Sequence, residues 1–331
     1  MKIGAQLLVQ DYPEFIETVK LLEKQNYARA WVVDSQMLWE DAYIFVTMAM
    51  TQTRAIVFGS AVSNPVTKHY SVTTGAAATF EGLFPGRWIL GMGRGDSAVR
   101  TLGMRPMKTA DMEQTLRKMQ ALLNGETVDE SGSEIRLRWT DASRKVPLCY
   151  AATGPRNLRI GGAIADIVML QVGTHPAAVK WAIDNVHAGA EAAGRDPAEV
   201  EISLLCGMWV SDDVREARDQ CRWAATCATN HLEDVVRAGP NHGMPKELLS
   251  MVEVKRDQYD YYAGHLDSKA DHADYLTDDM IDRFAIAGDG AHCRDRIAEL
   301  ESLGVHEISS AYLNGLFDQI GVVGDEIIAR L

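Results

Sequence analysis

The segment ILGMGRGDSAVR, at residues 89–100, places a glycine at every second position behind a short apolar run, with an acid and a serine directly after. Glycine-rich turns after strands let backbone N–H groups approach a phosphate, and the Arg94 guanidinium adds a two-donor contact for an anion. Dinucleotide-binding folds instead use G-x-G-x-x-G at the first strand–helix turn. Gly93, Arg94 and Gly95 are therefore candidates for another kind of anion-binding turn, the alternative being a tight turn without a ligand.

A second turn of this type is Thr153-Gly154-Pro155-Arg156, which also follows an apolar run. Proline suits the first turn of a helix, and the unpaired backbone N–H groups at that end bind phosphate well. Either turn alone is equally compatible with a purely structural role. Two of them on neighbouring strands favour one phosphate-bearing cofactor, so Thr153, Gly154 and Arg156 are candidate cofactor contacts.

Polar and titratable side chains follow other apolar runs as well. Asp34 and Ser35 come at the end of the run at 30–34, and His175 comes shortly after the run at 167–172. Asp96 has two interpretations: it caps the N-terminus of a following helix, or it is an acid that exchanges a proton with a ligand. His175 is equally compatible with a structural role and with contact to a substrate.

The elements that must position these residues alternate between strand and helix. Near-continuous apolar runs, typical of strands covered on both faces, occupy residues 2–9, 30–34, 55–62, 87–92, 146–151, 167–172, 200–210 and 307–313. Helical patterns occupy residues 12–25, 41–52, 71–83, 109–123, a segment from 155, 175–193, 211–238 and 318–331. This order predicts a TIM (β/α)8 barrel, an α/β fold, as one domain over residues 1–331. The active site of such a barrel lies at the carboxyl ends of its strands.

Two stretches interrupt the alternation. Residues 126–140 are polar and resemble a hairpin, and residues 239–276 form the longest insertion, between the seventh and eighth predicted strands. The second stretch carries three tyrosines beside a lysine and an arginine within 255–262. It is either a lid over the mouth of the barrel or a helical pair on the surface.

Composition excludes several classes of function. A net charge of −13 without a clustered basic face argues against nucleic-acid binding. The five scattered cysteines form no C-x-x-C, and the chain has no H-x-H, so we expect no metal site and no metal-dependent hydrolase. No apolar run reaches membrane-spanning length, and none at the N-terminus resembles a signal peptide. We therefore expect a cytoplasmic protein with reduced cysteines.

Four runs carry a family resemblance. G-S-A-V-S-N-P-V-T-K-H (59–69), L-G-M-G-R-G-D-S-A (90–98), A-T-G-P-R (152–156) and A-D-I-V-M-L (165–170) resemble the luciferase-like flavin oxidoreductases. Within these, the chain is most similar to the deazaflavin (coenzyme F420) branch that includes methylenetetrahydromethanopterin reductase. The resemblance spans nearly the whole chain, and its motifs choose poorly between cofactors and between substrates.

The resemblance implies roles for particular residues on one side of the predicted barrel mouth. It implies a non-proline cis peptide at Ala61–Val62, forming a bulge that presses on the central ring of the cofactor, and a polar cofactor contact at Asn64. It also implies a cofactor-phosphate site at residues 153–156. Arg94 lies where relatives that use flavin mononucleotide (FMN) place a phosphate-binding arginine.

The resemblance also implies an acid near the ring at Asp96, an acid at Asp34 and a substrate-facing group at His175. Relatives often carry histidine directly after the position of Asp34, and this chain has Ser35 there. That departure leaves open which group exchanges a proton with the substrate.

These features together predict an oxidoreductase that transfers a hydride between F420 and a small organic substrate. The first alternative is an FMN-dependent monooxygenase that uses reduced flavin and O₂, which would require a separate flavin reductase as partner. The second is a flavin-binding relative without activity. Because relatives are commonly homodimers, the resemblance also predicts a homodimer.

Overall fold

Eight parallel strands form a closed barrel in the computed structural model, which describes residues 1–331 except 142–144, 238–242, 247, 250–275 and 313–316. Around the barrel the strands follow the order β1-β12-β9-β8-β7-β4-β3-β2. Their bounds are β1 Lys2–Leu7, β2 Arg29–Val32, β3 Val57–Ser60, β4 Trp88–Met92, β7 Leu148–Ala152, β8 Ile167–Leu170, β9 Glu201–Leu205 and β12 Glu307–Tyr312. The predicted TIM barrel is confirmed.

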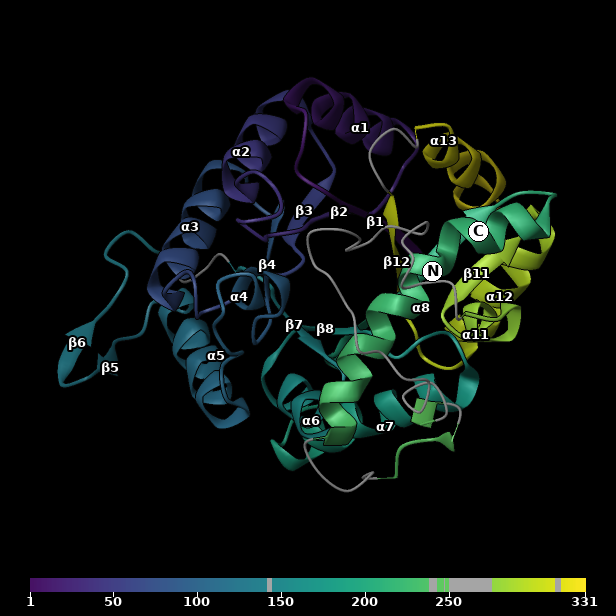
Figure 1. The fold of residues 1–331 in the computed structure, drawn as a ribbon. Coiled ribbons are helices and arrows are strands. Elements are labelled where there is room, and N and C mark those ends of the chain that lie inside the picture. The colour runs from purple at the N-terminus through teal and green to yellow at the C-terminus, as the bar shows by residue number, and fades with distance from the viewer. Residues whose placement is uncertain (142–144, 238–242, 247, 250–275, 313–316) are drawn as a thin grey trace.

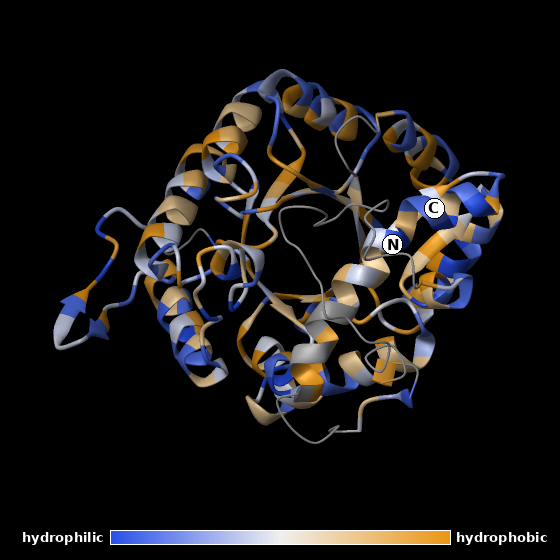
Figure 2. Cartoon of the chain, viewed as in Figure 1, coloured by the Kyte–Doolittle hydropathy of each residue, from blue (hydrophilic) through white to orange (hydrophobic). Residues whose placement is uncertain are grey.

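The helices form an outer ring around these strands (Figure 1). They include α1 Tyr12–Lys24, α2 Ala42–Gln52, α3 Tyr70–Leu83, α5 Thr109–Leu123, α6 Pro155–Ile164, α7 Pro176–Ala192, α12 Gly290–Ser302 and α13 Phe317–Glu326. The long α8 (Val214–Arg237) instead crosses in front of the strands in this view. Figure 2 shows many of these helices with hydrophilic and hydrophobic faces. In α1 the buried residues are Phe15, Ile16, Val19 and Leu22, which is the spacing of one helix face.

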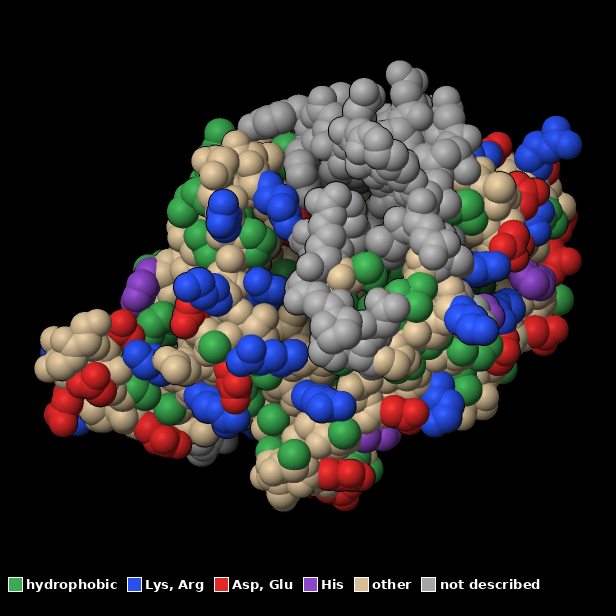
Figure 3. Space-filling model, turned by 60° about the horizontal axis from the view of Figure 1, so that its bottom comes forward, with side chains coloured by type: hydrophobic (Ala, Val, Ile, Leu, Met, Phe, Trp, Pro, Cys, Tyr) green, Lys and Arg blue, Asp and Glu red, His purple; other side chains and the backbone are tan. Residues whose placement is uncertain are grey.

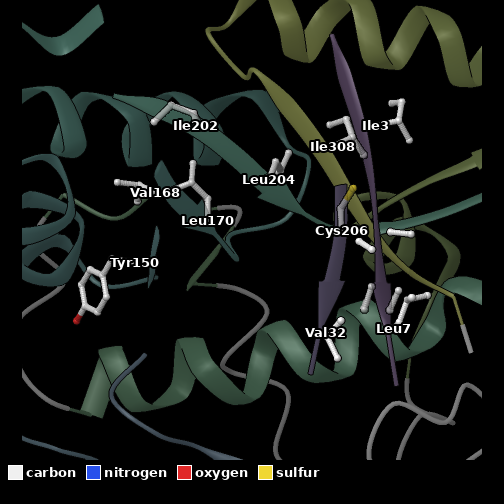
Figure 4. Close-up of a cluster of buried hydrophobic side chains, with 14 of the residues drawn as sticks. Ile3, Leu7, Val32, Tyr150, Val168, Leu170, Ile202, Leu204, Cys206 and Ile308 are labelled. Carbon is white, nitrogen blue, oxygen red and sulfur yellow. The ribbon is translucent and has the colours of Figure 1, made fainter. Parts of the chain in front are cut away.

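Alternate strand residues point outward into the layer between barrel and helices. Figure 4 shows such side chains from several strands, among them Ile3, Val168, Ile202 and Ile308, all buried. The opposite set points into the barrel, where Trp31 is fully buried. A Cβ atom on Gly59 would lie 2.5 Å from the Trp31 ring, so this interior is filled by one large side chain against a glycine. The barrel is therefore a packed core below its mouth.

The predicted strand at 200–210 is wrong as one element. The chain leaves the barrel at Cys206, and β10 (Gly207–Val210) pairs in parallel with β11 (Ala285–Gly288) in a separate two-stranded sheet. The backbone N–H of Cys206 still bonds to Ser309 of the barrel, whereas that of Gly207 bonds to Phe284. The sequence pattern does not show this change because both halves are apolar.

In the described part of the chain between β10 and β12, three elements had not been predicted: β11, the short α11 (Asp278–Asp282) and α12. Most of the predicted insertion at 239–276, including its tyrosines, lies outside the described residues. The predicted hairpin is confirmed as β5 (Val128–Glu130) and β6 (Ser133–Ile135), which projects from the barrel beside α3 and α5 (Figure 1).

An ion cluster closes the amino-terminal end of the barrel. Arg29 donates to Glu307 at 2.8 Å and to both oxygens of Glu201 at 2.6 and 2.9 Å, while Lys2 bonds to Glu201 at 2.9 Å. The indole N–H of Trp31 donates to Glu307 at 3.0 Å. Burial raises the pKa of the fully buried Glu307, and the Arg29 charge opposes this. For Glu201 burial acts in the same direction, but Arg29 and Lys2 lower its pKa overall.

Glu23, near the end of α1, holds the loop that leads to β3. One carboxylate oxygen accepts the backbone N–H groups of Arg54, Ala55 and Ile56, at 2.8, 2.6 and 3.1 Å. Burial raises the pKa of Glu23, but the three donors and the Arg87 charge lower it below its ordinary value of 4.5 overall.

We expect Glu23→Gln to lower the free energy of unfolding by about 1–2 kcal/mol at neutral pH, because three charge-assisted hydrogen bonds lose the carboxylate. Since the pKa of Glu23 is lowered in the folded state, this stability is present above pH 4.5. It is lost as the pH falls through the folded-state pKa. Chemical denaturation at neutral and acidic pH measures the difference, with the exposed Glu17→Gln as control. A deficit that stays the same in acid would contradict the assignment.

Candidate active site

A cavity of about 1270 Å³ opens at the carboxyl ends of the barrel strands. Its walls come from the turns after β2, β3, β4, β7 and β8, and α8 adds Trp223, Cys227 and Val235. Gln6, Met169 and Leu205, from the inward face of the barrel, also line it. Figure 3 shows Lys and Arg side chains along the surface that borders the residues drawn in grey. The volume suffices for a drug-sized cofactor together with a second small molecule.

Most of the predicted site residues converge on this cavity although they are far apart in sequence. Those that line it are Asp34, Ser35, Ala61, Val62, Asn64, Gly93, Arg94, Gly95, Asp96, Thr153, Gly154 and Arg156.

His175 is the predicted site residue that the structure does not place on the cavity. It lies at the N-cap of α7, where its Nδ1 accepts the backbone N–H of Ala177 at 3.3 Å. The preceding Thr174 is bonded to the carbonyl of Arg283 at 2.7 Å, so the chain has already turned toward the segment before β11. Proline in the first turn of α7 is consistent with this capping role.

The glycine pattern after β4 makes room for the end of β3. The peptide between Ala61 and Val62 is cis, as the resemblance implied. A Cβ atom on Gly91 would lie 1.8 Å from the carbonyl oxygen of Ser60, and one on Gly93 would lie 2.6 Å from Val62. Gly95 has φ of +99°, a conformation that favours glycine. The spacing G-x-G-x-G therefore shapes the cavity wall through close backbone packing.

The loop after β3 is tied together by Asn64, which is buried. Its side-chain oxygen accepts the backbone N–H groups of Val66 and Thr67 at 3.1 and 2.9 Å and the Thr67 hydroxyl at 3.2 Å. The group that Asn64 can offer to a ligand in the cavity is therefore its amide NH₂.

Arg94 is held by a reciprocal pair of bonds with Met107. Its Nε donates to the Met107 carbonyl at 2.6 Å, and the Met107 N–H donates to the Arg94 carbonyl at 2.9 Å. This fixes the stem of the side chain and leaves the outer guanidinium nitrogens for other contacts.

Asp96 lies at the predicted N-cap position, but its side chain does not cap the helix. Asp96 occupies the N-cap position of the short α4 (Ser97–Arg100), but its side chain makes no capping hydrogen bond. Its carboxylate instead accepts from Nε of Arg100 at 2.8 Å, and both residues line the cavity.

The N-terminus of α6 faces the cavity without a side-chain cap. Gly154 is the N-cap, and no side chain of the described residues caps this end of the helix. Pro155, Arg156 and Asn157 of the first turn line the cavity. Within the described residues, Arg94, Arg105 and Arg156 line the cavity without an ion pair to an acid. A helix N-terminus beside such cations favours an anionic group in a protein whose net charge is −13.

Asp34 is the most buried acid on the cavity wall, with its side chain 3% exposed. One oxygen bonds to Lys68 at 2.6 Å and the other accepts the Ser63 hydroxyl at 2.7 Å. The adjacent Ser35 shares a hydrogen bond of 2.5 Å with Ser97, which joins the turns after β2 and β4. Ser35, at the position where relatives often have histidine, therefore uses its hydroxyl in a bond between two turns.

Ser63 and Lys68 lie within the run at 59–69, but sequence reasoning gave them no role, because their contact with Asp34 is long-range. The cavity residues of α8 were also missed, since an apolar helix face gives no sign that it lies over a site. Arg105 was missed as well, and nothing in its local sequence marks it as a cavity residue.

The structure is a TIM barrel with a cavity at the carboxyl ends of its strands, lined by Ala61, Val62 and the N-terminus of α6. A cavity in this place is the usual active site of such a barrel. The chain belongs to the luciferase-like monooxygenase family, whose sequence profile matches residues 2–307. It is therefore an oxidoreductase of this family, which includes F420-dependent and flavin-dependent enzymes. Among the described residues, no helix is long and apolar enough to cross a membrane.

Similar proteins include two 5,10-methylenetetrahydromethanopterin reductases. The chain is 27% identical over 320 residues to the 5,10-methylenetetrahydromethanopterin reductase of Methanolobus tindarius, covering 93% of this chain and 94% of that one. It is 26% identical over 347 residues to the enzyme of the same name from Archaeoglobus fulgidus, covering 100% of both. An F420-dependent hydroxymycolic acid dehydrogenase of Mycobacterium tuberculosis is 28% identical over 250 residues, 69% of this chain and 68% of that one.

Solved structures share the fold. The F420-dependent tetrahydromethanopterin reductase of Methanopyrus kandleri superposes with a TM-score of 0.79 at 20% identity, over 99% of both chains. The FMN complex of the oxygenating constituent of 3,6-diketocamphane monooxygenase, from Pseudomonas putida, has a TM-score of 0.70 at 14% identity, over 100% of this chain and 99% of that one. The fold therefore occurs with both cofactor types.

Proposed function

We propose that the protein transfers a hydride between coenzyme F420 and a small organic substrate, with both molecules bound in the cavity. The observation that carries this proposal is that Ala61 and Val62, directly after β3, and the N-terminus of α6 line one cavity. The apolar side chains of Ala61 and Val62 offer a surface for a planar ring, and the helix N-terminus offers a site for a phosphate on its tail. Full-length similarity to reductases of the F420 branch supports the choice of cofactor.

The residues present fit such a cofactor. Thr153, Gly154 and Arg156 would hold the phosphate, with Arg94 as a further cation. Ala61 and Val62 would lie against the ring, because Gly91 and Gly93 allow that segment to pack tightly on β4. F420, when bound, supplies the carbon that accepts or donates the hydride.

The acids of the cavity are the groups that could hold or move a proton. Asp34 is buried and bonded through both oxygens, whereas the Asp96 side chain is 24% exposed and paired with Arg100. We infer that Asp34 provides the fixed charge next to the reacting atoms and that Asp96 exchanges protons at the mouth. Neither role uses the side chain of residue 35, where relatives often have histidine, because the Ser35 hydroxyl is bonded to Ser97.

The runner-up is an FMN-dependent monooxygenase that uses O₂ and reduced flavin from a separate reductase. The observation that favours it is Arg94, which resembles the phosphate-binding arginine of FMN relatives and lines the cavity. A third possibility is a flavin-binding relative without turnover.

Separate titrations with F420 and with FMN, followed by fluorescence, decide between these proposals. We expect stoichiometric binding of F420 and at least about tenfold weaker binding after Arg156→Gln, because a charge-assisted contact of about 1.5–3 kcal/mol is lost. Arg138→Gln, on an exposed arginine, is the matched control. Binding of FMN alone would favour the monooxygenase, and binding without reduction by any alcohol or reduced pterin would favour the inactive relative.

We also infer a homodimer formed through α2 and α3. These neighbouring helices expose large apolar side chains: Ile44 (64%), Val72 (63%) and Leu83 (65%). Exposed apolar side chains gathered on adjacent helices are typical of a protein interface. Light scattering should give twice the chain mass for the wild type and the monomer mass for Ile44→Glu with Val72→Glu. Val214→Glu, at an exposed valine of α8, should leave the mass unchanged.

A further inference from the structure

Lys68 reaches the cavity acid Asp34 from behind the cavity wall. It lies in the loop after β3, and its ammonium is 2.6 Å from one Asp34 oxygen. Lys68 itself does not line the cavity, whereas Asp34 does. The Lys68 side chain is 21% exposed and that of Asp34 is 3% exposed, so the pair connects the cavity wall with the outer face of the loop.

The remaining contacts of this pair fix both side chains. Ser63 donates to the second Asp34 oxygen at 2.7 Å, and its hydroxyl lies 2.9 Å from the Tyr43 hydroxyl. The Lys68 ammonium lies 4.7 Å from the centre of the Tyr43 ring, a cation–π contact, and 3.5 Å from Asp41. Burial raises the pKa of Tyr43, so this hydroxyl stays neutral.

The two acids of the cavity, Asp34 and Asp96, differ in their exposure to solvent. Asp96 and its partner Arg100 have side chains 24% and 34% exposed, so solvent screens both. Asp34 has no such screening, and a buried carboxylate without a partner is costly enough that it takes up a proton instead. The charge that the cavity receives from Asp34 therefore depends on Lys68.

We propose that Lys68 is a positioning residue that keeps Asp34 as an oriented anion facing the cavity. Ser63 sets the rotation of the carboxylate by holding its second oxygen, and Lys68 supplies the charge that keeps the carboxylate ionised. This inference rests on the proposed function for the use of that charge, namely to orient the substrate beside the cofactor. The pairing itself is a property of the protein without cofactor.

The first measurement uses the free protein. The carboxyl carbon of Asp34, isotope-labelled and assigned by its disappearance in Asp34→Asn, is observed by NMR at neutral pH. We expect a carboxylate signal in the wild type and in Lys68→Arg, and a carboxylic acid signal in Lys68→Met. Thermal unfolding confirms that each variant is folded. A carboxylate signal that persists in folded Lys68→Met would overturn the proposal.

The second measurement separates positioning from a purely structural ion pair. A fixed charge beside a bound chromophore shifts its absorption band, so the spectrum of bound F420 reports on Asp34. We expect Asp34→Asn, Lys68→Met and the double variant to show the same displaced band, and Lys68→Arg to restore the wild-type band.

Two results of this second measurement would overturn the proposal. A wild-type band in Lys68→Met with a displaced band in Asp34→Asn would show that Lys68 does not act through Asp34. An unchanged band in Asp34→Asn would show that the Asp34 charge does not reach the ring, and either result overturns the proposal. Absence of F420 binding by the wild type would refute the proposed function, and the NMR result would then decide the pairing by itself.

Discussion

Gly91→Ala should lower the free energy of unfolding by about 3 kcal/mol, the upper end of the usual cost of overpacking. The added Cβ would lie 1.8 Å from the carbonyl oxygen and 3.0 Å from the carbonyl carbon of Ser60, both backbone atoms. The two residues are also joined by the Ser60 hydroxyl, which donates to the Gly91 carbonyl at 2.8 Å and accepts the Gly91 N–H at 3.0 Å. A side-chain rotation cannot relieve this clash, so β3 and β4 must separate.

Gly82→Ala is the matched control, because a Cβ on Gly82 of α3 meets no atom within 4 Å. Alanine there should stabilise the helix by about 0.5–1 kcal/mol. Urea unfolding of both variants measures the contrast. The Gly91 variant should also bind F420 more weakly than the wild type, since the Ala61–Val62 segment follows Ser60 directly. Equal stabilities of the two variants would show that this part of the barrel adjusts to an added methyl group.

Much of the barrel follows from the sequence, because its strands are buried on both faces and appear as separate apolar runs. The run at 87–92 became β4, and the turn after it came to the cavity as expected. Several helix boundaries agreed closely, as in α5, where residues 109–123 match on both sides. The last predicted helix, at 318–331, was too long, because α13 ends at Glu326 and a short 3-10 helix follows at Ile328–Arg330.

The failures have a common physical cause, namely partners that are distant in sequence. Whether residues 207–210 continue β9 or pair with β11 depends on a strand almost eighty residues later, which no local pattern indicates. Lys68 and Asp34 are likewise separated by 34 positions. His175 has the local setting of a site residue, but the course of the chain after β8 takes it to a helix cap.

The glycine motif was interpreted correctly in one respect. It is not a dinucleotide fingerprint, and the structure gives a reason for each glycine: Gly91 and Gly93 face the end of β3, and Gly95 has φ of +99° and lies against Val99. The first two glycines therefore follow from the close approach of neighbouring strands.

Arg29→Met should have the largest effect on stability, a loss of about 3–5 kcal/mol, because it leaves a buried carboxylate without its counter-ion. Glu307 is fully buried and would keep only neutral partners, the indole N–H of Trp31 and the Ser203 hydroxyl, among the described residues. Glu201 is less affected, because Lys2 still bonds to it and its side chain is 20% exposed. Lys180→Met, at an exposed ion pair with Asp184, is the surface control and should cost at most about 0.5 kcal/mol.

A second substitution tests whether the buried charge is the cause. Arg29→Met with Glu307→Gln removes both charges of the contact and keeps an amide oxygen for the Trp31 N–H at the same position. We expect the double variant to recover at least about half of the loss, since replacing both members of a buried pair is far milder than removing one. If the double variant is as unstable as Arg29→Met alone, lost packing of the arginine stem explains the effect instead.

The pH dependence gives an independent check on the same charge. Burial already raises the pKa of Glu307 above 4.5, and loss of Arg29, which opposes that rise, should raise it further. A carboxyl whose folded-state pKa is raised stabilises the fold below its unfolded-state pKa, and that stability is lost as the pH rises through the folded-state pKa. The deficit of Arg29→Met should therefore be smaller in mild acid than at alkaline pH when both are measured by urea unfolding. The double variant carries no carboxyl at residue 307, so it should show a smaller difference, which comes from the loss of Arg29 beside Glu201. A deficit of Arg29→Met that grows in acid would exclude Glu307 as the source.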